Sequence, residues 1–400
     1  MSQVKTYGYA YIEQFQCLAD QCEHHCCSGW RVALNDERVE LYQQDYPELY
    51  ELIARDEGGY HMRRGDAACI AYCDGLCSIH RDYGESLLSN TCIDYPRMYR
   101  AITDFYTRAG TMSCPEIARK CLFDADPFAL VPTQLPDNHR HGEGLVPLRI
   151  DNLDEQLWHQ VMSAMFDAVN HGHNGIEQTL LMVSSLAHQL AQSPTDTWPV
   201  LIAEVTQCSY GQQREADGDR AEGENELATH MAKLLLEHID HPTAPNYLRQ
   251  RVLAAFRPWH HDSSEPLLVA LLSGYKSYYQ RHQTGWIRHV LKRFMVAEMT
   301  RIGFPFLSIT PAGKDYGETL AEWGTTLCIR VLSLRLLLVI LAASATMEEN
   351  HQPGQNVVSE WVYQFCRRTN HLQSGPCERQ LRQLLLSGER LSDYVGFNRM

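Results

Sequence analysis

Apolar residues recur at helical spacing through most of the chain after residue 150. In residues 152–170 they return every four positions from Leu153 to Val169, as on the buried face of an amphipathic helix. Asn152 and Glu155 have the spacing of a capping box, which favours a helix start at Asn152. This stretch therefore predicts an amphipathic helix packed against a core.

Similar patterns predict further helices over residues 176–192, 199–208, 226–240, 246–257, 265–282 and 286–302, with two more inside 355–394. Residues 209–226 are polar, acidic and glycine-bearing, which favours a mobile loop. The sequence thus predicts a mainly α protein in which residues 151–400 form an all-helical domain.

The strongest apolar run, residues 334–345, lies in a predicted helix over 317–346 that also carries Arg330 and Arg335. A membrane-spanning helix needs about 20 apolar residues, and the two arginines leave this run short of that. A buried core helix is the favoured interpretation. The alternative is a basic-edged helix lying on a membrane surface, as a peripheral association.

The pattern before residue 150 is less regular. Residues 36–57 predict a helix that Pro47 breaks or bends. Asp74-Gly75 is a turn signal just before Cys77. Residues 1–123 are therefore expected to form a small, loop-rich domain. The proline-rich stretch 124–150, which has no apolar period, is expected to be a linker.

Cysteine is concentrated in this first domain, which holds ten of the chain's 14 cysteines: Cys17, Cys22, Cys26, Cys27, Cys69, Cys73, Cys77, Cys92, Cys114 and Cys121. Thiols grouped so closely form disulfides, bind zinc or hold an iron–sulfur cluster. The polar, aromatic start of the chain is unlike a secretory signal, so a reducing cytoplasmic location is expected. There, such a framework favours metal binding over disulfides.

Spacing leaves zinc and iron–sulfur both open. His24, His25 and His80 lie among the cysteines, which is compatible with mixed zinc ligation. An all-thiolate set suits a [4Fe–4S] cluster, which needs four such donors. The C-x3-C-x2-C pattern of radical S-adenosylmethionine enzymes is missing, because Cys27 directly follows Cys26.

Net charge adds a limit on partners. The chain of 400 residues carries a formal charge of −14, spread along its length. Nucleic acid binding depends on clustered Lys and Arg, so no nucleic acid partner is expected. A partner with a cationic surface is compatible with this charge. Self-association into an oligomer is also compatible with it.

Three stretches of the first domain resemble the flagellin lysine-N-methylase (FliB) family, within a wider group of proteins with a CxxCxxCC-type zinc- or iron-chelating segment. They are FQCLADQCEHHCCSGWRVALND (15–36), DGLCSIHRDYGESLLSNTCIDYPRMYR (74–100) and SCPEIARKCL (113–122). The resemblance extends over roughly residues 11–122. Ile70-Ala71 replaces an apolar pair that is common in the family, and Cys73 and Cys121 are extra cysteines.

This resemblance implies a cytoplasmic enzyme that transfers methyl groups from S-adenosylmethionine to lysine side chains of flagellin and requires a [4Fe–4S] cluster. The metal ligand pool that it implies is Cys17, Cys22, Cys26, Cys27, Cys69, Cys77, Cys92 and Cys114. It assigns no catalytic residue and no methyl-donor pocket. Two alternatives remain: a zinc- or iron-binding adaptor that acts through protein partners, and an iron or redox sensor.

Overall fold

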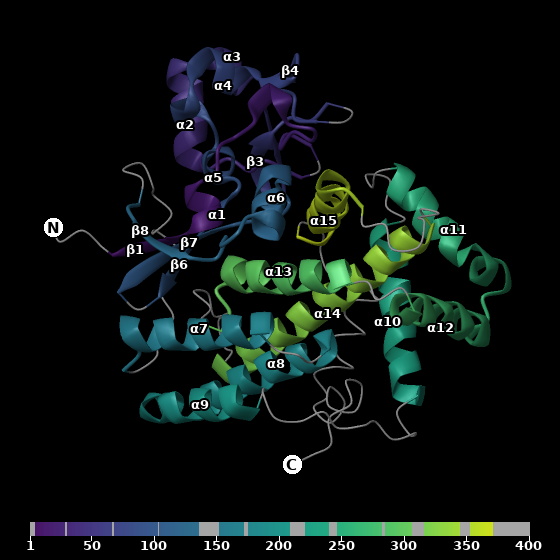
Figure 1. Ribbon diagram of the computed structural model, residues 1–400. Coiled ribbons are helices and arrows are strands. Elements are labelled where there is room, and N and C mark those ends of the chain that lie inside the picture. Colours follow the sequence, from purple (N-terminus) through teal and green to yellow (C-terminus); the bar gives the residue numbers. More distant parts are fainter. Residues whose placement is uncertain are drawn as a thin grey trace.

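The chain folds into an N-terminal part of short helices and small sheets and a larger part built of long helices (Figure 1). The computed structural model describes residues 5–28, 30–65, 68–102, 104–135, 152–171, 175–208, 221–239, 246–281, 285–305, 316–344 and 353–370. The predicted mainly α fold is confirmed.

A four-stranded sheet in the order β6-β7-β1-β8 joins the start and the end of the N-terminal part. Its strands are β1 (Thr6–Tyr9), β6 (Arg97–Ile102), β7 (Phe105–Gly110) and β8 (Leu130–Thr133). β1 runs parallel to β7 and antiparallel to β8, whereas β6 and β7 form an antiparallel hairpin. The sequence predicts no sheet here. The period-two burial of β7, with Phe105, Thr107 and Ala109 inside, is the signal that identifies the strand.

Strand β8 lies inside the stretch 124–150 that the sequence predicts as a linker. It pairs with β1 from Thr6 opposite Thr133 to Tyr9 opposite Leu130. At least this portion of the stretch is therefore built into the sheet, while residues 136–150 lie outside the described residues.

The cysteine-rich region lies next to this sheet and has a small core of its own around Tyr42 and Leu49. Its helices are α1 (Ala10–Glu13), α2 (Asp36–Asp45), α3 (Pro47–Tyr50), α4 (Ser78–Tyr83), α5 (Asn90–Asp94) and α6 (Pro115–Phe123). Its hairpins pair β2 (Ile53–Asp56) with β3 (Gly59–Met62), and β4 (Tyr72–Cys73) with β5 (Leu76–Cys77).

The helix predicted over residues 36–57 is shorter than expected. α2 ends before Pro47, as predicted, but β2 replaces the last part of that helix. The reason is the turn that follows: Asp56 Oδ1 accepts the Gly58 N–H at 2.8 Å, and Gly59 has a φ of +92°, which glycine adopts at little cost. The chain therefore reverses into β3.

The long helices of the second part lie close to the predicted ranges. They are α7 (Glu155–His171), α8 (Ile176–Gln192), α9 (Trp198–Cys208), α10 (Ala221–Ile239), α11 (Asn246–Asp262), α12 (Glu265–Arg281) and α13 (Gly285–Ile302). The predicted cap of α7 is wrong. Asn152 has a φ of +59°, and Asp154 Oδ1 accepts the Leu157 N–H at 2.8 Å, so Asp154 caps the helix. Residues 209–220 of the loop predicted over 209–226 lie outside the described residues, and the prediction is wrong for residues 221–226, which form the first turns of α10.

Helix α14 (Tyr316–Ser344) forms the centre of this helical part and packs against α8, α10, α11 and α13. Residues Gly324–Ala343 are long and apolar enough to cross a membrane, but 78% of them are buried within the fold. This burial matches the predicted core helix.

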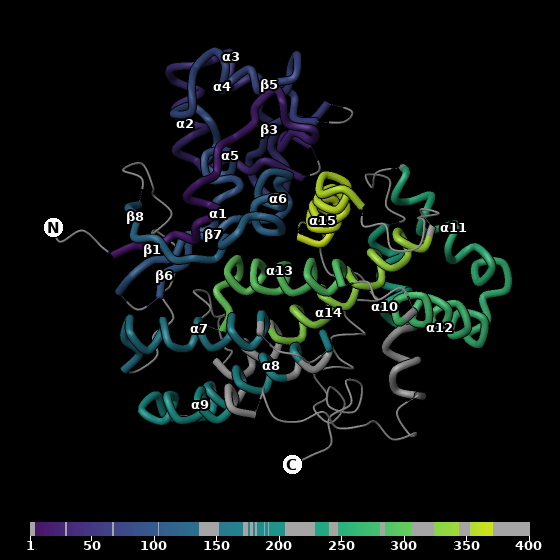
Figure 2. The backbone as a smooth tube through the Cα atoms, viewed as in Figure 1, coloured from purple at the N-terminus to yellow at the C-terminus, as the bar shows by residue number. Residues whose placement is uncertain are grey.

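Helix α15 (Gln355–Thr369) lies between the two parts of the molecule, shown in yellow beside α6 and above α13 in Figure 2. It packs on α6 from one side and on α14 from the other. It is the first of the two helices predicted within 355–394, and residues 371–400 lie outside the described residues.

Candidate metal centre

Backbone hydrogen bonds tie the cysteine-bearing segments together. The Cys69 N–H donates to the Cys27 carbonyl at 2.8 Å, and the Ser78 N–H donates to the Ala71 carbonyl at 2.8 Å. Strands β4 and β5 place Tyr72 opposite Cys77. Segments that are about 40 residues apart in the chain therefore meet at one place.

The Asp74-Gly75 turn makes the β4–β5 hairpin possible. Asp74 has a φ of +52° and Gly75 a φ of +85°, the positive values that a two-residue hairpin turn requires. The predicted turn is confirmed, and it brings Cys77 back toward Cys69.

Five cysteines come together here, and we call them the five-thiol cluster: Cys26, Cys27, Cys69, Cys77 and Cys92. The Cys27 thiol lies beside the thiols of Cys26 and Cys77 and shifts the pKa of both. Cys69 and Cys92 lie within electrostatic range of both Cys26 and Cys77. Five of the eight predicted ligands thus occupy one neighbourhood.

The other three predicted ligands form a second group, the three-thiol cluster: Cys17, Cys22 and Cys114. Cys114 is buried and precedes α6, where the Glu116 and Ile117 N–H groups donate to its sulfur. The Ala19 N–H donates to the Cys17 sulfur at 3.4 Å. Cys22 connects the two groups, because it interacts with both Cys17 and Cys26.

The two extra cysteines are placed differently. Cys73 is exposed, and its thiol donates to Asp74 Oδ2 at 3.4 Å. Cys121 is fully buried in the main core, within electrostatic range of Cys366. The structure therefore assigns neither of them to the two clusters.

Hydrogen bonds to sulfur set the charge state of the five-thiol cluster. The Cys27 thiol, together with the N–H groups of Ile79 and His80, lowers the pKa of Cys77 to about 6. The Cys27 thiol also lowers the pKa of Cys26 to about 7, whereas burial raises the pKa of Cys92 to about 12. N–H donors stabilise thiolates, which are the form that binds metals.

The donor chemistry of the five-thiol cluster fits a thiolate-bound metal group. Four sulfurs are enough for a [4Fe–4S] cluster or a zinc ion, and five are gathered. Among the described residues, however, no three His, Cys, Asp or Glu side chains already have the arrangement of a metal site. Metal binding therefore requires the sulfurs to move closer to one another.

The histidines differ in their availability as ligands. His24 Nδ1 is 2.9 Å from Gln364 Nε2 and its Nε2 is 3.3 Å from Ser28 Oγ, so both ring nitrogens are engaged. His25 stacks on Tyr72 with ring centroids 3.7 Å apart, and its buried Nδ1 has no hydrogen-bond partner among the described residues. Of these two histidines, His25 thus fits mixed zinc ligation better.

Helix α15 contributes contacts that the sequence did not predict. The Arg367 guanidinium donates to the carbonyl oxygens of His24, His25 and Ser28. It also lies over the Trp30 ring, 5.0 Å from the centroid. The sequence carries no signal for this contact, because Arg367 lies about 340 residues after the loop that it binds.

Aromatic side chains also pack together beside the segment that Arg367 binds. The rings of Trp30 and Tyr95 lie 4.9 Å apart, and Tyr95 Oη is 3.2 Å from Ser113 Oγ. Arg97, which the resemblance also includes, lies over Phe15 at 5.5 Å. Contacts of this kind are typical of core packing.

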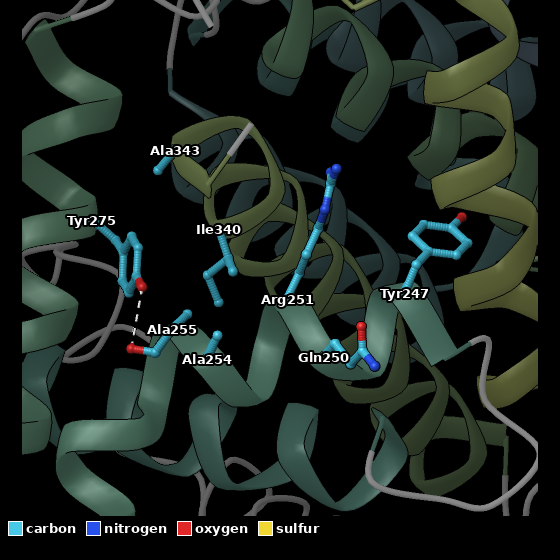
Figure 3. Close-up of a pocket in the computed structure, with 8 residues that line it drawn as sticks. All are labelled: Tyr247, Gln250, Arg251, Ala254, Ala255, Tyr275, Ile340 and Ala343. Carbon is cyan, nitrogen blue, oxygen red and sulfur yellow. Dashed lines mark hydrogen bonds between the residues drawn. The ribbon is translucent and has the colours of Figure 1, made fainter. Parts of the chain in front are cut away.

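The described residues also line an open groove of about 510 Å³ between α11, α12 and α14 (Figure 3). Its walls include Tyr247, Arg251 and Ile340, and Tyr275 Oη donates to the Ala255 carbonyl at 3.4 Å. None of its lining residues is a cysteine. The groove is therefore separate from the thiol clusters.

The pKa shifts predict a difference in pH dependence between Cys77 and Cys73. Because the pKa of Cys77 is lowered to about 6 and that of Cys73 is raised by Asp74, Cys77 is largely a thiolate at pH 7 and Cys73 is largely a thiol. In the metal-free protein, we expect iodoacetamide labelling of Cys77 to reach half its maximal rate near pH 6. Labelling of Cys73 should still be rising at pH 9. Peptide mass spectrometry measures both rates, and two coinciding profiles would contradict the assignment.

The chain is similar to known proteins over about a third of its length. It is 25% identical over 142 residues to the lysine-N-methylases of Salmonella typhimurium and Salmonella choleraesuis and to the flagellar biosynthetic protein FliU of Salmonella muenchen. Each match covers 32% of this chain. It spans 35% of each lysine-N-methylase and 84% of FliU. The resemblance to lysine-N-methylases that the cysteine motifs indicated is confirmed.

No family model and no solved structure matches the chain.

Proposed function

We propose that this chain is a cytoplasmic protein-lysine N-methyltransferase that transfers methyl groups from S-adenosylmethionine to lysine side chains of flagellin and depends on a cysteine-bound [4Fe–4S] cluster. The names of its relatives support methyl transfer to lysine and a flagellar role. The five-thiol cluster supports the cofactor.

The observation that carries this proposal is the meeting of five thiols from three separate segments, with N–H donors directed at their sulfurs. The four ligands that the cluster needs would come from among Cys26, Cys27, Cys69, Cys77 and Cys92. When bound, a [4Fe–4S] cluster supplies one-electron chemistry, or an iron position that can hold a cofactor. The three-thiol cluster would then provide further thiols nearby or form a second metal site.

The protein side chains must also prepare the lysine. A lysine amine has a reference pKa of about 10.4 and is protonated at neutral pH, so polar transfer requires loss of that proton before the nitrogen attacks the methyl group. A site that excludes water lowers the amine pKa, because burial disfavours the charged form.

A second candidate function is a zinc-stabilised adaptor that binds a protein partner. The buried and unpartnered Nδ1 of His25, next to the five-thiol cluster, favours it. A set of three thiolates and one imidazole is a common structural zinc site. Such a site would fold the N-terminal part without any methyl transfer.

The test is methyl transfer by protein purified without oxygen. The iron-loaded chain is incubated with S-adenosylmethionine labelled in its methyl group and with purified flagellin, and mass spectrometry locates the label. We expect methylated lysines with the wild-type chain and with Cys73→Ser, and none with Cys77→Ser. Absence of transfer by an iron-replete wild-type sample would reject the enzyme, and zinc without labile sulfide would favour the adaptor.

A further inference from the structure

We propose that Arg367 on α15 is the positioning residue that holds the backbone of the cysteine loop, residues 24–28, beside Cys69 and Cys77, from where the thiols of Cys26 and Cys27 can close around a metal. The helical part of the molecule would then complete the metal centre that the N-terminal part carries. This inference rests on the proposed function, since it assumes that the five-thiol cluster is a metal site.

Arg367 makes four polar contacts with residues 24–28. Its Nη1 donates to the His24 carbonyl at 3.2 Å, and its Nη2 donates to the His25 carbonyl at 3.0 Å and to the Ser28 carbonyl at 2.9 Å. Nη2 is also 3.2 Å from Ser28 Oγ. With 7% of its surface exposed, Arg367 makes these bonds away from bulk water, where charge-assisted hydrogen bonds are strong.

The loop depends on such contacts because it has no regular structure of its own. Residues 24–28 lie outside every helix and strand, so no regular secondary structure supplies partners for their carbonyl groups. A single planar guanidinium binds three of these carbonyls at once, on both sides of Cys26 and Cys27. A lysine ammonium lacks that fork of donors.

Gln364, one turn earlier on α15, extends the same contact. Its Nε2 is 2.9 Å from His24 Nδ1, and the His24 ring packs edge-on against Tyr363. The helix thus holds the loop through side chains on one of its faces.

The end of α15 is itself fixed in place, which makes Arg367 a rigid support. Arg330 on α14 donates to Thr369 Oγ1 at 2.7 Å and to Asn370 Oδ1 at 2.5 Å. Asn370 Nδ2 in turn donates to Thr111 Oγ1 at 2.9 Å, beside the sheet. Loop, helix and sheet therefore form one connected network of hydrogen bonds.

Hydrogen exchange on the metal-free, full-length chain tests the support directly. We expect Arg367→Gln to speed exchange of the Cys69 amide by about tenfold or more, because this amide donates to the Cys27 carbonyl and the loop that carries this carbonyl loses its three bonds to Arg367. Arg367→Lys keeps the charge and restores this protection only in part. The control is Arg55→Gln, which removes a similar cation–π contact, with Tyr60 at 4.9 Å, far along the chain from the loop.

Metal retention is the second readout. The anaerobically loaded chain is challenged with a chelator, and the loss of bound iron or zinc is followed by absorbance and metal analysis. Groups that orient metal ligands typically change affinity by about 10–100-fold, so Arg367→Gln should lose metal at least about tenfold faster than Arg55→Gln. Equal exchange and equal metal loss in Arg367→Gln and Arg55→Gln would overturn the proposal.

The two readouts separate this inference from the proposed function. If the wild-type chain binds no metal, the metal centre is rejected, and unchanged exchange would reject the role of Arg367 independently. If Arg367→Gln does not fold, as judged by circular dichroism, Arg367→Lys alone decides. Wild-type exchange and metal retention in that variant would then overturn the positioning role.

Discussion

Replacing Cys77 by serine is expected to reduce the metal bound to the chain by at least about tenfold. Cys77 is the member of the five-thiol cluster with the most direct contacts to sulfur and to N–H donors: the Cys27 thiol and the amides of Ile79 and His80. A serine hydroxyl is not a soft ligand, and it stays protonated where a thiolate forms. The variant therefore loses a ligand and not only a contact.

The measurement is the iron, zinc and acid-labile sulfide content of protein purified without oxygen, together with visible absorbance. Cys73→Ser is the matched control, since Cys73 lies in the same hairpin but is exposed and bonded to Asp74. It should keep wild-type metal. An equal loss in both variants would mean that the hairpin fold, and not the Cys77 sulfur, determines the metal content.

Replacing Glu298 by glutamine is expected to lower the free energy of unfolding by about 3–5 kcal/mol. Glu298 is 1% exposed and pairs with two arginines. Arg301 donates to its two carboxylate oxygens at 3.0 and 2.9 Å, and Arg330 Nε lies 2.7 Å from Oε2. Without the carboxylate, two buried guanidinium groups lose their counter-charge, which costs far more than an exposed pair would.

Urea unfolding of the metal-free chain, followed by circular dichroism, measures this loss. The control is Glu265→Gln, which removes an exposed ion pair with Lys233 and should change stability by less than about 1 kcal/mol. A loss in Glu298→Gln no larger than the control would contradict the importance of the buried pair. Since Arg330 also binds Thr369 and Asn370, faster exchange in α15 should accompany the loss.

The sequence predicted the long helices well because each buries one face at a regular period. Leu157, Val161 and Met165 repeat on the face of α7 that enters the core. In α14 the apolar run is continuous instead, because other helices surround this part of the helix and most of its residues from 327 to 342 are buried. The sheet was missed. Its strands span four to six residues, and β1 pairs with partners about 100 residues away, a distance over which no local pattern reports.

The metal centre could likewise be predicted only in part. The cysteine positions and the family resemblance supplied the eight candidate ligands, but their spacing along the chain could not show which of them lie together. The grouping of Cys26 and Cys27 with Cys69 and Cys77 depends on tertiary contacts such as the Cys69 N–H to Cys27 carbonyl bond. Arg367 was beyond prediction for the same reason, since only the docking of α15 brings it to residues 24–28.

The most direct test of the metal centre is to measure iron, zinc and acid-labile sulfide in the wild-type chain purified and handled without oxygen. A cysteine-bound [4Fe–4S] cluster predicts about four iron atoms and four sulfides per chain, with the broad visible absorbance of such clusters. A folded chain that holds neither iron nor zinc after reconstitution would contradict a metal centre at the five-thiol cluster.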